Sequence, residues 1–118
     1  MASLKMNGPY LLIPDKIDKY IKTKTPGNYA LGYVAEQNFV VLYVGRDDFD
    51  LNTRLKSLVY AKSNCLFFKY SLANSAQEAY IKECKNYHDF GKASQLKNEK
   101  HPQVQPGSDW ECLLCNGD

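Results

Sequence analysis

The sequence contains no long hydrophobic run and no strong excess of charge of either sign. Its first apolar stretch, residues 10–13, is too short for a signal-peptide core, and no stretch approaches the ~20 apolar residues of a membrane-spanning helix. We therefore expect a cytoplasmic protein that does not associate with a membrane. The formal net charge of +2 permits nucleic-acid binding but does not by itself indicate it.

Arginine is scarce, because only Arg46 and Arg54 occur among the fifteen cationic residues. Both follow closely after residues 43–45. Lysine suffices for a solvated surface, whereas the guanidinium group offers a rigid fork that matches phosphate oxygens. The placement therefore suggests phosphate contacts, although chance also accounts for a skew of two residues.

Cysteine is also sparse, and only one close pair exists among the four. The candidate ligands of a structural zinc ion are Cys112, Cys115, His88 and His101. A single Cys-x-x-Cys pair is half of a tetrahedral zinc site, and the histidines could complete it. Cys65 and Cys84 fall in strand and helix patterns that suit buried apolar thiols. Without a second tight pair, the sequence favours unligated, reduced thiols over zinc.

Periodic patterns predict one small α+β domain. Residues 29–34 alternate in character, residues 36–38 form a turn and residues 39–44 are almost continuously apolar, which is typical of a β-hairpin. A helix is expected over 50–59 and a third strand over 65–71. We expect a three-stranded antiparallel sheet flanked by helices, in a fold class written α/β (α+β), and a monomer, since no coiled-coil pattern is present.

Two further helices are predicted on either side of this segment. Pro14 opens a short helical pattern whose buried face comprises Ile17, Tyr20 and Ile21. The apolar run before it is expected to dock on the core as an extended segment. Ser75, with Glu78 three positions later, is a capping-box start for the last helix.

The last predicted helix carries a carboxylate on its apolar face. The stripe comprises Ala76, Ala79, Tyr80, Glu83, Cys84 and Tyr87. A buried carboxylate is costly unless it is paired or bound to a metal. Glu83 is therefore either a metal ligand, the partner of Arg54 or a lysine in a salt bridge, or a residue at the solvated edge of the stripe.

These motifs together resemble the GIY-YIG endonuclease superfamily. The resemblance rests on Gly27-Asn28-Tyr29, on Tyr43-Val44-Gly45, on Arg54 in the next helix and on Glu83 in the pattern that begins at Ser75. Within that superfamily, the sequence is most similar to the N-terminal nuclease domain of the excision-repair endonuclease. The resemblance spans residues 26–98 of a single domain 1–118, with an N-terminal extension at 1–25 and a Cys-x-x-Cys tail at 99–118.

The resemblance implies a divalent-metal-dependent endonuclease that hydrolyses DNA phosphodiester bonds. Tyr29 would act as a general base or orient the attacking water, with Tyr43 nearby, and Arg54 would neutralise charge on the phosphate. Glu83 would hold one Mg²⁺ or Mn²⁺ ion. Further phosphate or DNA contacts are implied for Gly45, Arg46 and Asn98.

The sequence departs from the family pattern at three points. Asn28 replaces an aliphatic residue, one extra residue separates Gly45 from Arg54, and Leu58 stands where some members carry a histidine. The extra residue could rotate Arg54 away from the site, and the missing histidine leaves only a tyrosine-based mechanism.

Two other functions remain open. The first is a non-catalytic module that retains the fold and binds nucleic acid or protein. The second is a zinc-stabilised interaction element built on the terminal cysteines. The expected partners are DNA, including branched or damaged DNA, and a protein that directs the domain to its target.

Overall fold

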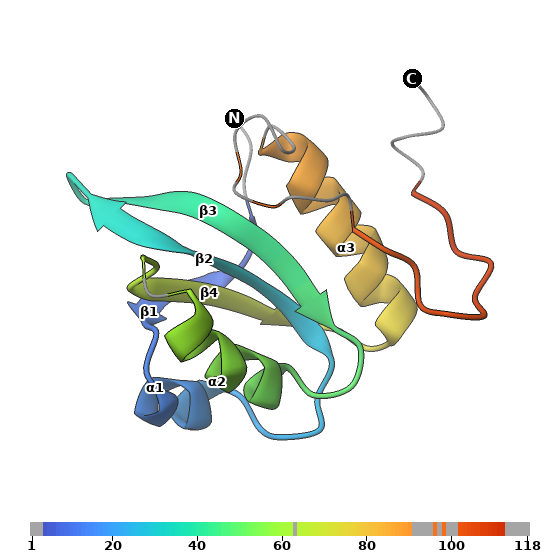
Figure 1. The fold of residues 1–118 in the computed structure, drawn as a ribbon, viewed down its shortest axis with the longest axis horizontal. Coiled ribbons are helices and arrows are strands. Elements are labelled where there is room, and N and C mark those ends of the chain that lie inside the picture. The colour runs from blue at the N-terminus through green and yellow to red at the C-terminus, as the bar shows by residue number, and fades with distance from the viewer. Residues whose placement is uncertain (1–3, 63, 91–95, 97, 99–101, 113–118) are drawn as a thin grey trace.

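The computed structural model describes residues 4–62, 64–90, 96, 98 and 102–112. Within these residues the chain forms four strands and three helices around one antiparallel sheet (Figure 1). The strands are β1 (Asn7–Leu11), β2 (Gly27–Ala35), β3 (Asn38–Asp47) and β4 (Phe67–Leu72), and their order across the sheet is β1-β4-β2-β3. The helices are α1 (Pro14–Tyr20), α2 (Leu51–Ala61) and α3 (Ala76–Asp89).

The hairpin predicted from the alternating pattern is confirmed as β2 and β3. Ala35 pairs with Asn38, so the turn contains two residues, Glu36 and Gln37, with φ of 52° and 70°. Positive φ at both turn positions matches the right-handed twist of the paired strands. The sheet places Tyr29 directly opposite Gly45, which brings the two predicted motifs together.

The prediction of three strands was wrong, because β1 adds a fourth. Tyr10 pairs with Phe68 and Leu11 with Phe67, so part of the segment expected to dock on the core is a strand. Pairing satisfies backbone groups that β4 would otherwise expose at its edge. Sequence periodicity could not show this contact, since about 57 residues separate the partners and no short turn joins them.

The two faces of the sheet are covered by different helices (Figure 1). On one face, α1 and α2 enclose a core whose buried members are Leu12, Ile17, Ile21, Leu31, Leu51, Leu55, Cys65 and Phe68. On the other face, α3 packs through Tyr87 against Ala30 and Val44. The N-terminal extension thus supplies three side chains of the larger core.

The predicted helix starts are confirmed by their caps. Asp50 accepts a hydrogen bond from the Thr53 amide at the start of α2, and Ser75 accepts one from the Glu78 amide at the start of α3. These side chains satisfy amides that have no partner within the helix. The helices therefore begin where the chain leaves the sheet, which sets the position of Arg54 and Glu83.

No helix in the described part of the chain is both long and apolar enough to cross a membrane.

Candidate functional site

A charged cleft of about 300 Å³ lies where β3 ends, between the start of α2 and the middle of α3. Its lining residues are Arg46, Asp47, Asp48, Phe49, Arg54, Glu83 and Gln103. Three carboxylates and two guanidinium groups therefore share one solvent-open hollow. Both arginines of the protein lie here, as their position after the second motif suggested.

Arg46 is the most firmly held cation in the cleft. Its guanidinium contacts Glu83 Oε1 at 2.5 Å and Asp48 Oδ1 at 2.7 Å, and it donates to the Gln103 carbonyl at 2.6 Å. It also lies 5.0 Å from the centre of the Tyr80 ring. Charge-assisted bonds to two carboxylates and a ring contact fix this side chain in one orientation.

Glu83 lines the cleft, but it is engaged by Arg46. Its side chain is only 11% exposed, which agrees with its predicted place on the apolar stripe of α3. The ion pair compensates for the cost of burying its charge. The partner differs from the expected Arg54 or lysine, because Arg46 at the end of β3 reaches α3 directly.

Arg54 points into the cleft and keeps half of its surface in water. Its Nε lies 3.2 Å from Asp47 Oδ2, and its side chain is 51% exposed. Such exposed pairs contribute little stability, so an incoming anion could replace the carboxylate. The extra residue before Arg54 does not turn it away from the site.

Tyr29 lies against Gly45 beside the cleft. A Cβ atom on Gly45 would overlap the Tyr29 ring and hydroxyl, so only glycine allows this approach. Burial raises the pKa of Tyr29 to about 12, and the negative charges of Glu83 and Asp47 raise it further while Arg54 lowers it. The phenol is therefore neutral at ordinary pH and can donate a hydrogen bond but is a poor base.

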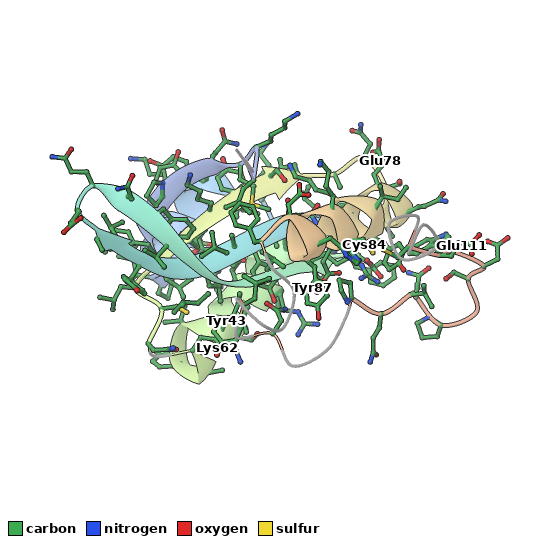
Figure 2. All side chains as sticks on the ribbon, turned by 90° about the horizontal axis from the view of Figure 1, so that it is seen from above. Tyr43, Lys62, Glu78, Cys84, Tyr87 and Glu111 are labelled. Atoms are coloured by element: carbon green, nitrogen blue, oxygen red, sulfur yellow. The ribbon has the colours of Figure 1, made fainter. Side chains whose placement is uncertain are left out.

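Tyr43 and Asn98 lie outside the residues that line the cleft. The Tyr43 ring packs with Lys62 near the end of α2, with 4.3 Å between Nζ and the ring centre (Figure 2). The Asn98 side chain pairs with the backbone of Val44 on the outer edge of β3, donating at 2.8 Å and accepting at 3.0 Å. These geometries suit a packing role for Tyr43 and an edge-pairing role for Asn98.

Sequence reasoning missed the two aspartates that bind the arginines. Asp47 holds Arg54, and it also accepts hydrogen bonds from the Phe49 and Asp50 amides at 2.9 and 2.6 Å. Asp48 holds Arg46. Two carboxylates directly after an arginine were a signal that could have been found, because a strand ending there exposes all three side chains to one loop.

Asn28, a departure from the family pattern, connects the sheet to α3. Its side chain is buried and donates to the Ala79 carbonyl at 2.8 Å. Ala79 lies one helical turn before Glu83. Asn28 therefore helps to set the position of the helix that carries the cleft carboxylate.

A second group of chemically active side chains lies beyond the cleft, between α3 and the C-terminal segment. Cys112 Sγ is 3.5 Å from His88 Nε2, and Cys112 also packs with Cys84. The other two predicted zinc ligands, His101 and Cys115, lie outside the described residues. Cys65 and Cys84 are buried, as their patterns predicted.

The cleft carboxylates have the chemistry that Mg²⁺ or Mn²⁺ prefers, since such ions bind carboxylate oxygens and water. Each of the three already contacts an arginine, and among the described residues no three His, Cys, Asp or Glu side chains form a metal-binding group. A divalent ion would therefore compete with Arg46 for Glu83 and take its other ligands from water and phosphate.

A larger hollow of about 560 Å³ lies elsewhere, beside the start of α3. Lys5, Lys82 and Lys85 contribute to its wall. None of the predicted catalytic residues lines it, so we place the candidate site in the smaller charged cleft.

Comparison of the chain with protein-family models, with curated proteins and with solved structures gave no significant match. The similarity to GIY-YIG endonucleases therefore stays a prediction from the motifs, and the proposals below depend on the residues and their geometry.

Proposed function

We propose that the protein is a divalent-metal-dependent endonuclease that hydrolyses DNA phosphodiester bonds in the charged cleft. One observation carries the proposal: a phenol, a guanidinium and a carboxylate from three separate elements meet at one cleft. Tyr29 comes from β2, Arg54 from α2 and Glu83 from α3, and the charges of both cleft residues act on the phenol. These are three of the four side chains that the family resemblance assigns to catalysis.

Each of the three side chains has a role that its surroundings allow. Arg54, half exposed and weakly paired, binds the phosphate and stabilises its developing negative charge. Tyr29, neutral and held against Gly45, donates a hydrogen bond that orients the attacking water or a phosphate oxygen. Glu83 would hold the divalent ion, which when bound would activate water and polarise the phosphate.

Arg46 regulates access to the carboxylate in this scheme. The Arg46–Glu83 ion pair and a metal bound at Glu83 are competing states of one carboxylate. Arg46 is also a second cation for the substrate, since its guanidinium fork matches phosphate oxygens. Binding of DNA phosphate by Arg46 would therefore favour metal binding at Glu83.

The test is cleavage of supercoiled plasmid and of branched oligonucleotides with Mg²⁺ or Mn²⁺. We expect Glu83→Gln and Arg54→Ala each to lower the rate about 100-fold or more, a typical loss for one transition-state contact. Lys56→Ala is a matched control, because Lys56 is another cation of α2 but pairs with Asp18, away from the cleft. A folded wild-type protein without divalent-dependent cleavage, or full activity in Glu83→Gln, would overturn the proposal.

A second candidate is a non-catalytic module that binds DNA, or a protein partner, through the same cleft. The observation that favours it is the engagement of Glu83 by Arg46, together with a neutral Tyr29. This function predicts salt-dependent DNA binding that Arg54→Ala weakens and Glu83→Gln leaves unchanged or strengthens. Fluorescence anisotropy with labelled DNA, measured beside the cleavage assay, separates the two functions.

A further inference from the structure

The C-terminal segment brings a cysteine to a cysteine and a histidine of α3. Cys84 and His88 are four residues apart, so they lie on the same face of the helix. Cys112 packs with Cys84 in a small buried cluster, and its Sγ lies 3.5 Å from His88 Nε2. Figure 2 shows Cys84 on the side of α3 toward the C-terminal segment that carries Glu111.

This separation has the length that one metal ion bound by both residues requires. Zinc binds cysteine sulfur at ~2.3 Å and histidine nitrogen at ~2.0–2.1 Å with tetrahedral angles, which places the two ligand atoms about 3.5 Å apart. The thiols are also buried and come from distant parts of the chain. Convergence of two thiols and an imidazole is the donor set of structural zinc sites.

We propose that Cys84, His88 and Cys112 are three ligands of a structural zinc ion. The spacing Cys112-x-x-Cys115 assigns the fourth ligand to Cys115, which lies outside the described residues. This ligand set replaces His101 by Cys84, which the helical pattern had suggested was only a packing residue. In the described part of the chain no three such side chains are yet arranged as a metal-binding group, so zinc binding requires them to move slightly closer together.

The zinc ion would fasten the C-terminal segment to α3. That segment already contacts α3 through Trp110, whose ring centre is 5.8 Å from that of Tyr80. Farther back along it, Gln103 accepts a hydrogen bond from Arg46 in the charged cleft. The site is structural, because thiolates and an imidazole fill a closed tetrahedron and leave no position for substrate. The proposal does not depend on nuclease activity.

The experiment measures the metal content of the full chain after expression with added zinc and purification without chelators. We expect about one zinc per chain, and less than a tenth of that in Cys112→Ser and Cys84→Ser. Cys65→Ser is the matched control, because Cys65 is equally buried but belongs to the core on the other face of the sheet. It should retain the zinc.

A second measurement keeps the test valid if a ligand variant fails to fold. Wild-type protein, stripped and refilled with Co²⁺, should show the sulfur-to-metal charge-transfer absorption of a tetrahedral thiolate site. EDTA should lower the melting temperature of wild type and of Cys65→Ser. A folded wild-type protein with less than about one zinc per ten chains and no Co²⁺–thiolate absorption would overturn the proposal, as would loss of zinc in Cys65→Ser alone.

Discussion

At the scale of single residues, the candidate site depends on how closely Tyr29 approaches Gly45. The two are paired across β2 and β3, and the ring occupies the space where any other residue at position 45 would place its Cβ. The glycine therefore positions the phenol beside Arg54 and Glu83. The family resemblance assigned Gly45 to phosphate contact, whereas the structure assigns it a packing role as well.

Replacing Gly45 by alanine should displace the Tyr29 ring. We expect Gly45→Ala to lower the free energy of unfolding by about 1–3 kcal/mol, the usual cost of overpacking, as measured by urea denaturation. In a Tyr29→Ala background the same change should cost much less, since the overlapping ring is gone. Equal costs in both backgrounds would contradict the overlap.

The protonation of Tyr29 should make stability decline in alkali. The folded pKa is raised to about 12 from the ordinary value of 10.0, chiefly by burial. Between these pH values the unfolded chain loses the proton while the folded chain keeps it, so stability falls as the pH rises. The decline attributable to Tyr29 is about 2–3 kcal/mol.

Denaturant unfolding between pH 9 and pH 12 measures this effect. Tyr29→Phe should decline less steeply with pH than wild type, because phenylalanine has no proton to lose. Tyr60→Phe, which alters a tyrosine that is 85% exposed, should follow the wild-type curve. A Tyr29→Phe curve parallel to that of Tyr60→Phe would show that the Tyr29 phenol is not protected.

At the scale of elements, the cleft is assembled by the attachment of two helices to opposite faces of the sheet. Asp50 begins α2 just after β3, and Asn28 bonds β2 to α3. Residues that are not themselves at the site thus set where Arg54 and Glu83 lie. Mutations at these attachments should alter the cleft more than their cost in stability suggests.

Asn28→Ala tests this coupling. We expect it to lower the free energy of unfolding by about 1–3 kcal/mol through the lost buried hydrogen bond, and to lower cleavage or DNA binding further by shifting α3. Asn52→Ala is the matched control, because Asn52 is also buried but bonds to the Ile21 carbonyl near α1. If the two variants lose equal function at equal stability, Asn28 does not position the site.

At the scale of the whole molecule, the N-terminal extension is an integral part of the fold. Its β1 strand completes the sheet, and α1 buries Ile17 against the core shared with α2. The region of family resemblance, 26–98, would therefore leave one sheet edge and one core surface uncovered. The additional strand is a feature of this chain that the motifs did not indicate.

A pair of isoleucines separates burial in this extension from mere presence. Ile17→Ala should lower the free energy of unfolding by about 2–5 kcal/mol, because it removes a fully buried side chain from the core. Ile13→Ala, which alters a side chain 39% exposed one residue before α1, should cost under about 1 kcal/mol. Similar melting temperatures for the two variants would contradict a core role for α1.

Local patterns in the sequence were sufficient for most elements. The hairpin, the capped starts of α2 and α3 and the buried face of α1 depend on neighbours a few residues apart, whose turn, cap and periodicity signals are written in the chain. The same patterns placed Arg54 at the edge of a helix and Glu83 on an apolar stripe. The pairing of Tyr29 with Gly45 followed from the hairpin register.

Only the tertiary structure decided which distant groups meet. It paired β1 with β4, joined Glu83 to Arg46 rather than to Arg54, moved Tyr43 and Asn98 away from the cleft and brought Cys112 to His88. The physical reason is that ion pairs and sheet edges select partners by distance and burial in space. A sequence records which side chains can form such contacts, but folding determines which of them come within reach.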